Sequence, residues 1–324
     1  MMRYMGLCAV LSIFLAGCSE SENVRISGHE RSIGFTTDVT RTAKEDFEAG
    51  DAFAVWGWYV PEDASSQVFD ATKVSTADGI SWSYENLRFW QADKTYAFHA
   101  LYPSVDMLPG TADCTADGIL SVSGFNVSRQ VDLMAATVPS MSGSLAAPVY
   151  FSFTHLLSRV QVVAKRSEST TGIEEFSPRI YAVRLYGMPE TGNLSINVAD
   201  LSDKTMILDA WTGVDATTSD SPLAVIQSSA GLDVANDGTI LFDVLTLPQH
   251  ITQNYQLEVE YSTSSDGSNR QIVAISLTSL PVTTWKAGQQ YRYTFSVSDD
   301  SRILFDIPTV NAWDEAIGGI TIVD

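Results

Sequence analysis

Basic side chains are scarce in this sequence. Its 324 residues carry 19 Lys and Arg against 39 Asp and Glu, which gives a formal net charge of −20. Binding to nucleic acid and adsorption to anionic lipid both need clustered positive charge. The composition therefore argues against a nucleic-acid partner and against a protein held to a membrane by charge. An acidic surface suits solubility outside the cell.

Signatures of catalysis and of metal binding are also missing. The four histidines are scattered, at His29, His99, His155 and His250. The sequence has no Gly-x-Ser-x-Gly, no His-Glu-x-x-His and no phosphate-binding glycine loop. No second His or Cys lies at ligand spacing from His155, so we expect it to be a hydrogen-bonded structural residue. We predict a protein that is not an enzyme, with no catalytic residues, no metal ligands and no cofactor.

No long segment has the periodicity of an amphipathic helix, whereas period-two alternation recurs. Apolar residues at every second position, separated by polar ones, predict strands with one buried face. The clearest examples are Tyr255, Leu257, Val259 and Tyr261, then Tyr291, Tyr293, Phe295 and Val297, and the shorter sets Ile33, Phe35 and Val39, and Val149, Phe151 and Phe153.

Asp-Gly pairs punctuate these strands. They occur at residues 78–79, 117–118, 237–238 and 266–267. Because glycine accepts the positive φ angle of a tight hairpin turn, we predict a hairpin at each pair. Short strands with regular turn signals are typical of β-sandwiches. About 300 residues fill one or two cores, and we predict two sandwich domains, at residues 31–166 and 167–324.

The N-terminus has the layout of an export signal. Arg3 precedes an apolar run too short to span a bilayer, and the run ends in Leu15-Ala16-Gly17-Cys18. This ending resembles the lipobox of bacterial lipoproteins, in which the thiol is alkylated, the signal is cleaved and the new N-terminus is acylated, with palmitate as the expected chain. We predict a signal peptide at residues 1–17 and lipidation of Cys18, which would anchor the protein in the outer membrane.

Residues 18–30 form the predicted polar tether. Its acidic start at residues 19–23 resembles a signal that sends lipoproteins to the outer surface in some anaerobic Gram-negative bacteria. A solvated tether explains the same residues. With Cys8 in the signal and Cys18 lipidated, Cys114 stays alone, so no intramolecular disulfide is expected.

An ordered set of segments resembles the fimbrillin-like lipoproteins, the subunits and accessory proteins of type V pili. No single segment is specific, and the order and spacing carry the resemblance. The segments are Thr40-Arg41-Thr42, Phe47, Gly50-Asp51-Ala52-Phe53-Ala54-Val55-Trp56-Gly57, Trp90, Tyr96-Ala97-Phe98-His99-Ala100-Leu101-Tyr102-Pro103, Asp132-Leu133-Met134-Ala135-Ala136, Phe151-Ser152-Phe153-Thr154-His155-Leu156-Leu157-Ser158-Arg159-Val160 and Trp285-Lys286-Ala287-Gly288-Gln289-Gln290-Tyr291-Arg292-Tyr293.

The resemblance implies two β-sandwich domains of transthyretin-like topology. It also implies that an arginine-specific protease cuts polymerising subunits near the N-terminus. The cut removes the first strand and opens a hydrophobic groove, which a C-terminal strand of the neighbouring subunit fills. The implied partners are other pilus subunits, and the implied location is the fimbrium on the cell surface.

Carried over to this chain, the removable strand would be residues 33–39, with Ile33, Phe35 and Val39 on one face. Arg41 follows it directly and is the candidate cleavage site, although a surface arginine in a loop explains it equally simply. Arg25 and Arg31 precede the strand, so a cut there would not open a groove.

The candidate donor strand lies at the extreme C-terminus. It contains Ile320, Ile322 and Val323, and follows Gly318-Gly319. This strand could instead complete its own domain. The sequence does not separate stalk, tip and anchor subunits, and a tip subunit would bind a host or bacterial surface ligand.

A glycan- or protein-binding surface lipoprotein that does not polymerise is the alternative function. The sequence has seven tryptophans, and exposed indoles could serve as stacking platforms. Trp56 and Trp58 share one parity of a predicted strand, so their exposure would favour this alternative and their burial would weaken it.

Overall fold

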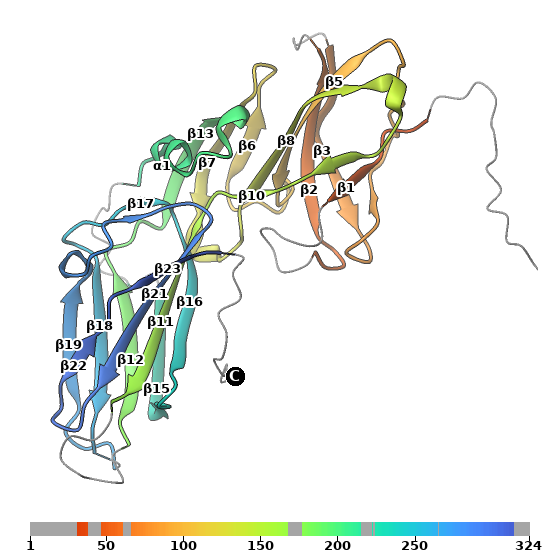
Figure 1. Cartoon of the computed structure of the whole chain (residues 1–324). Coiled ribbons are helices and arrows are strands. Elements are labelled where there is room, and N and C mark those ends of the chain that lie inside the picture. Colours follow the sequence, from red (N-terminus) through yellow and green to blue (C-terminus); the bar gives the residue numbers. More distant parts are fainter. Residues whose placement is uncertain are drawn as a thin grey trace, which may run out of the picture. The chain divides into compact units, whose positions relative to one another are not determined.

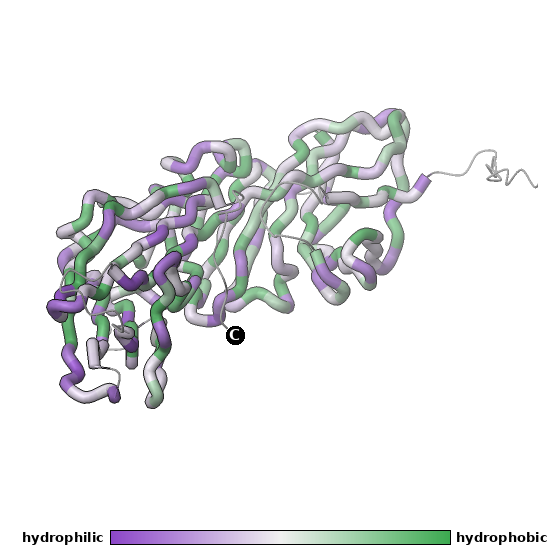
Figure 2. The backbone as a smooth tube through the Cα atoms, turned by 60° about the horizontal axis from the view of Figure 1, so that its bottom comes forward, coloured by the Kyte–Doolittle hydropathy of each residue, from purple (hydrophilic) through white to green (hydrophobic). Residues whose placement is uncertain are grey.

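The computed structural model describes residues 31–37, 47–60, 66–167, 177–214, 222, 224–264 and 266–313. The described residues form 23 β-strands, one α-helix and short 3-10 turns (Figure 1). The chain is all-β, as the sequence predicts, and its sheets pack face to face as sandwiches. Figure 2 shows hydrophilic and hydrophobic residues interspersed along the strands.

A six-stranded sheet, called the β2 sheet below, organises the N-terminal half. Its order is β10-β8-β5-β2-β3-β4, and the described partners are antiparallel. Figure 1 shows β2, β5 and β8 side by side. Its strands are β2 (Ala52–Tyr59), β3 (Gln67–Thr76), β4 (Trp82–Ser83), β5 (Thr95–Tyr102), β8 (Met134–Ser142) and β10 (Thr154–His155).

Both faces of the β2 sheet are covered, and this explains why β2 does not alternate. Phe53 and Val55 belong to a core that includes the small sheet of β1 (Phe35–Thr37) and β9 (Val149–Phe151). Trp56 and Trp58 belong to a second core on the opposite face. Parallel β1 and β9 form a two-stranded sheet of their own.

The second core is completed by a sheet that joins the two halves of the sequence, called the β7 sheet below. Its order is β14-β13-β7-β6, so strands on either side of the predicted boundary at residues 166–167 pair directly. The boundary stays a prediction. The strands are β6 (Thr111–Cys114), β7 (Ile119–Asn126), β13 (Thr191–Asn197) and β14 (Trp211–Thr212).

Helix α1 (Lys204–Ala210) was not expected from the sequence. It is only seven residues long, which is too short for a periodic pattern to stand out. Its N-cap is Asp203, whose carboxylate accepts hydrogen bonds from the backbone N–H groups of Thr205 and Met206. The buried Ile207 holds the helix against the second core.

The C-terminal sandwich consists of two facing sheets, the β11 sheet and the β12 sheet. Their inner faces share one core, which contains Val160, Val259 and Phe295. The β11 sheet contains β11 (Ser158–Arg166), β16 (Thr239–Thr246), β21 (Gln289–Val297), β22 (Ile303–Phe305) and β23 (Thr309–Ala312). The β12 sheet contains β12 (Arg179–Tyr186), β15 (Ala224–Asp233), β18 (Gln256–Ser262) and β19 (Gln271–Ser276), and a separate pair is formed by β17 (Gln249–His250) and β20 (Thr284–Trp285).

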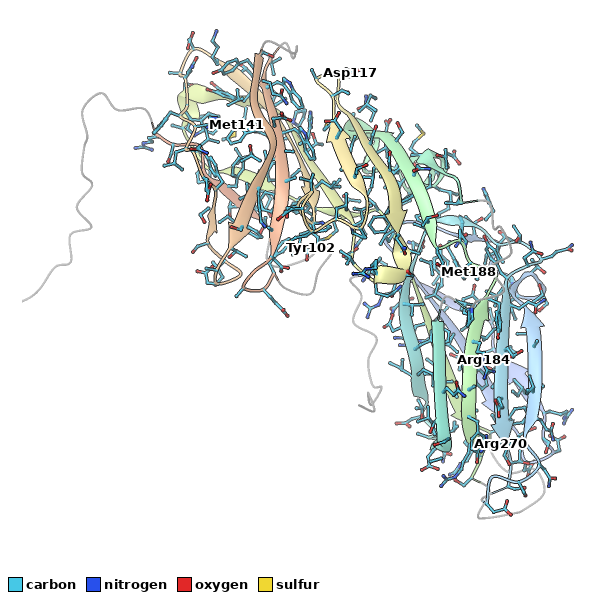
Figure 3. All side chains as sticks on the ribbon, turned by 180° about the vertical axis from the view of Figure 1, so that it is seen from behind. Tyr102, Asp117, Met141, Arg184, Met188 and Arg270 are labelled. Atoms are coloured by element: carbon cyan, nitrogen blue, oxygen red, sulfur yellow. The ribbon has the colours of Figure 1, made fainter. Side chains whose placement is uncertain are left out.

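The alternating strands behave as their sequence predicts. In β18 and just before it, Tyr255, Leu257, Val259 and Tyr261 are all at most 1% exposed, whereas Gln256 is exposed. On the polar face, Arg184 of β12 lies 2.7 Å from Glu258 and 3.7 Å from Glu260 (Figure 3). One face therefore fills the core and the other carries paired charges.

Three of the four predicted hairpins are present, and the one at residues 237–238 is wrong. Glycines 79, 118, 238 and 267 all have positive φ, as expected of these turns. The pairs β3-β4, β6-β7 and β18-β19 are antiparallel neighbours. Strands β15 and β16 instead belong to different sheets, so the turn between them carries the chain across the sandwich. A two-residue turn signal sets local backbone geometry but not which sheet receives the next strand.

Candidate functional site

The first described strand presents alternate side chains to the core. Ile33 is 1% exposed, and Phe35 and Thr37 are each 6% exposed, whereas Gly34 and Thr36 are half-buried. Strand β1 itself covers only Phe35–Thr37, so it is shorter than the predicted strand at residues 33–39. Val39 lies outside the described residues.

The backbone of this segment has partners on two sides. Phe35, Thr36 and Thr37 are in parallel register with β9, and the N–H of Val149 donates to the carbonyl of Gly34 at 2.8 Å. Before the strand, the N–H of Ile33 donates to the carbonyl of Arg88 at 2.8 Å. The segment is therefore bound along a short length.

The side chain of Phe35 has a much larger set of contacts. Its ring stacks on Phe151, with centroids 5.8 Å apart and planes 11° from parallel. Four further rings meet it edge to face. We call the five rings around Phe35 the aromatic pocket, and they are Phe53, Phe69, Tyr84, Phe98 and Phe151.

Two side chains of the pocket region also hold the segment by hydrogen bonds. The Tyr84 hydroxyl donates to the carbonyl of Ile33 at 2.8 Å. The indole Nε1 of Trp82 donates to Oγ1 of Thr37 at 3.2 Å. Burial raises the pKa of Tyr84 above its usual value, so the hydroxyl stays protonated as a donor at neutral pH.

We call residues 31–37 the plug, and we call the surface that they cover, which includes the aromatic pocket, the groove. Burying a large apolar side chain contributes roughly 1.5–3 kcal/mol. A three-residue strand with few ladder hydrogen bonds is thus held mainly by Ile33 and Phe35.

The C-terminal end of the described chain is anchored at Trp313. Its N–H donates to the carbonyl of Gly288 at 3.2 Å, and its indole stacks on His155. Strand β23, just before it, pairs with β21 at an edge of the β11 sheet. No local sequence signal marks Trp313 as an anchor, because its partners His155 and Gly288 are distant along the chain.

Several predicted site residues lie outside the described residues. They are Cys18, Val39, Arg41, Ile320, Ile322 and Val323. The aromatic pocket was missed by sequence reasoning, because its rings come from strands far apart in the chain. His155 is confirmed as a hydrogen-bonded buried residue, 4% exposed, with Nδ1 3.0 and 3.2 Å from the two carboxylate oxygens of Asp132.

The tryptophans do not form exposed platforms. Trp56 is fully buried and Trp58 is 2% exposed, which weakens the alternative of sugar recognition on that face. Each of the other five is buried or half-buried. They are Trp82, Trp90, Trp211, Trp285 and Trp313.

Two features are absent from the described part of the chain. It contains no group of three or more His, Cys, Asp or Glu side chains placed to hold a metal ion. None of its helices is both long and apolar enough to cross a membrane. The lone described thiol, Cys114, is buried in the second core, and burial raises its pKa to about 12.

A sequence-family comparison decides the relationship suggested by the ordered segments. The model of the family described as fimbrillin-like matches residues 40–313. The chain belongs to the fimbrillin-like family. This confirms the resemblance, and membership supports a pilus-related or adhesive role on the cell surface for this fimbrillin-like protein. It favours a structural protein over an enzyme.

Solved structures show the same fold. A fimbrial protein from Bacteroides vulgatus has a TM-score of 0.62 and 15% identity, with 87% of this chain and 99% of that chain covered. A candidate cell adhesion protein from Bacteroides uniformis has a TM-score of 0.53 and 18% identity, with 88% and 100% covered. Another from Bacteroides ovatus has a TM-score of 0.51 and 15% identity, with 89% and 99% covered. The search of curated proteins found no match.

Proposed function

We propose that this fimbrillin-like protein is a pilus subunit that assembles by strand exchange after its first strand is removed. The observation that supports this most is the plug formed by residues 31–37. A short strand with few backbone bonds covers a pocket of five aromatic rings. Such a segment can be released without breaking a long ladder, and its loss creates a site for another strand.

Arg41 is the proposed point of cleavage. It follows Thr37 by four residues, so a cut after it would free the whole plug from the rest of the chain. Arg31 is exposed and precedes Ile33, so a cut there would leave Ile33 and Phe35 attached. Position relative to the plug therefore distinguishes the two arginines.

The proposed donor is the C-terminal segment with Ile320, Ile322 and Val323. Alternate apolar side chains are what a strand needs to enter a groove with one buried face. The segment begins beyond Trp313, which is anchored in its own subunit. A donor attached at a fixed point would keep each subunit linked to the next.

Export would precede this assembly. Lipidation of Cys18 would bring the precursor to the outer membrane, and the cut at Arg41 would then separate the working subunit from its lipid. An uncut chain would stay anchored and would serve as a base or a free-standing surface protein. The role of the protein thus depends on whether Arg41 is cleaved.

Digestion with an arginine-specific protease tests the proposal. Wild-type protein is expected to be cut after Arg41 and to form a ladder of polymers on unboiled gels. Arg41→Ala is expected to retain its plug and to stay monomeric. Arg31→Ala is the matched control and should polymerise as the wild type does. A ladder from the Arg41→Ala variant, or complete cleavage at Arg41 with no polymer, would contradict the proposal.

A further inference from the structure

We propose that the groove under the plug dictates the direction and register of the donor strand. This inference rests on the strand exchange proposed above and adds which donor residue enters which position. The inward positions of the plug are those of Ile33, Phe35 and Thr37. In the proposed register they are taken, in that order, by Ile320, Ile322 and Asp324 of a second copy.

The three inward positions differ in chemistry. Ile33 and Phe35 lie in the apolar core of the β2 sheet, and Phe35 fills the aromatic pocket. Thr37 is different, because its Oγ1 accepts a hydrogen bond from the indole of Trp82 at 3.2 Å. The positions of Ile33 and Phe35 therefore favour apolar side chains, and the position of Thr37 favours a hydrogen-bond acceptor.

The end of the chain has this order of chemistry. Its last five residues are Ile320-Thr321-Ile322-Val323-Asp324, with apolar, apolar and acceptor side chains at alternate positions. A strand running in the same direction as the plug would place a carboxylate oxygen beside Trp82. The indole N–H would then exchange the Thr37 hydroxyl for a carboxylate oxygen and would stay hydrogen-bonded.

Shifted registers lose one of these matches. Moving the donor by two residues one way places Asp324 in the aromatic pocket, where a carboxylate would be desolvated without a partner. Moving it the other way places Ile322 against the Trp82 N–H and leaves Gly318 at the position of Ile33. Reversed strands either bury Asp324 at the position of Ile33 or leave Gly318, which has no side-chain acceptor, beside Trp82.

The remaining contacts of the plug are with its backbone and would accept any residue. Tyr84 donates to the carbonyl of Ile33, and the N–H of Trp90 donates to the carbonyl of Arg31 at 2.9 Å. In the proposed register Gly318 and Gly319 fall at the exposed positions 31 and 32. Position 31 needs no side chain, because the carbonyl of Gly318 can accept the hydrogen bond from the Trp90 N–H.

Disulfide trapping tests the register on the outer face of the strand. Thr36 is the register partner of Tyr150 in β9, and Tyr150 is 49% exposed. The proposed register places Val323 at the position of Thr36. Tyr150→Cys combined with Val323→Cys should therefore give intermolecular disulfides in polymers after arginine-specific cleavage. Neighbouring strands lie at about 4.8 Å, which is close enough for the bond.

Tyr150→Cys combined with Thr321→Cys is the matched control. It should give no cross-link, because Thr321 takes the position of Gly34 in the proposed register. Cys18 leaves with the released fragment and Cys114 is buried, so neither should interfere. Polymers that cross-link through Thr321, or through neither pair, would overturn the register and leave strand exchange standing. Absence of polymers in the wild type would instead overturn the proposed function itself.

A pair of charge substitutions gives a second readout. Ile322→Asp should abolish polymer formation, since it places a carboxylate among the rings of the aromatic pocket. Asp324→Asn retains an acceptor beside Trp82 and should polymerise to within about twofold of the wild type, because a neutral amide satisfies the same donor. If Ile322→Asp polymerised and Asp324→Asn did not, the order of the pockets proposed above would be wrong.

Discussion

The imidazole of His155 and the indole of Trp313 lie face to face, with ring centroids 3.7 Å apart and planes 6° from parallel. Asp132 contacts Nδ1 of the imidazole, and the guanidinium of Arg159 lies 5.8 Å from the centre of the indole. Three segments of the chain, at Asp132, at His155 and Arg159, and at Trp313, thus converge on one stacked pair of rings. The end of β23 is held by this stack as well as by its ladder with β21.

Trp313→Ala should loosen β23 without unfolding the protein. Stacked aromatic pairs contribute about 0.5–1.5 kcal/mol beyond their buried area. Hydrogen exchange of the β23 amides should therefore be faster by roughly tenfold, while exchange in β11 stays unchanged. Trp313→Phe is the control, because it retains a ring on His155 and should protect β23 nearly as well. Equal exchange in all three proteins would show that the stack does not hold the strand.

Phe35→Ala should destabilise the protein strongly. Truncation of a buried Phe costs about 3–5 kcal/mol, since it removes buried area and leaves a cavity. The free energy of unfolding in urea measures this loss. Thr36→Ala is the matched control, because Thr36 is half-buried on the outer face, and it should change the stability by less than about 1 kcal/mol. A small effect of Phe35→Ala would mean that the plug contributes little.

Asp78 should make the turn between β3 and β4 sensitive to acid. Hydrogen bonds from the backbone N–H groups of Ser81, at 2.6 Å, and Ile80, at 2.9 Å, hold the pKa of this carboxyl well below its ordinary value of 3.8. A lowered folded-state pKa means that the stabilisation is present above pH 3.8 and is lost as the pH falls further.

Asp78→Asn tests this acid sensitivity. The variant should be less stable than the wild type at pH 7, and the difference should shrink steadily as the pH falls below 3.8. Urea midpoints at pH 7, 4 and 3 measure the difference. Asp70→Asn, which removes an exposed carboxylate from the neighbouring β3, is the charge-matched control. A difference that does not vary with pH would rule out the ionised carboxylate as the cause.

Gly79→Ala should cost more than Gly50→Ala. Both glycines have positive φ, +78° and +97° respectively, and a side chain in that region costs about 1–2 kcal/mol. A Cβ at Gly79 would also lie 2.1 Å from the backbone oxygen of Phe47, whereas one at Gly50 would meet nothing within 4 Å. Thermal unfolding should give a much lower melting temperature for Gly79→Ala than for Gly50→Ala. Equal melting temperatures would show that the backbone at Phe47 moves away from the added Cβ at little cost.

Much of the fold could be predicted from the sequence, for a local reason. Alternation in Tyr255 to Tyr261 sets which face of a strand is buried, whatever the strand packs against. Glycine after Asp78, Asp117 and Asp266 sets the backbone of a turn. These properties depend on neighbouring residues only, so they can be recognised before any tertiary contact is known.

The same locality explains what alternation and turn signals could not predict. The run from Ala52 to Tyr59 shows no alternation because it is covered on both faces, and its tryptophans face a core instead of solvent. The turn at Gly238 leads into another sheet, which no local signal encodes. Helix α1 is too short for its periodicity to be seen.

The sequence by itself determined the class of this protein, which is acidic, all-β and fimbrillin-like, and it determined which face of each alternating strand is apolar. Only the tertiary structure decided that Phe35 closes a pocket of five rings, and that Trp313 is fixed on His155. The physical reason is that these sites are assembled from residues distant along the chain. Alternation predicts that a side chain is buried. The residues that it contacts are decided only when the sheets pack.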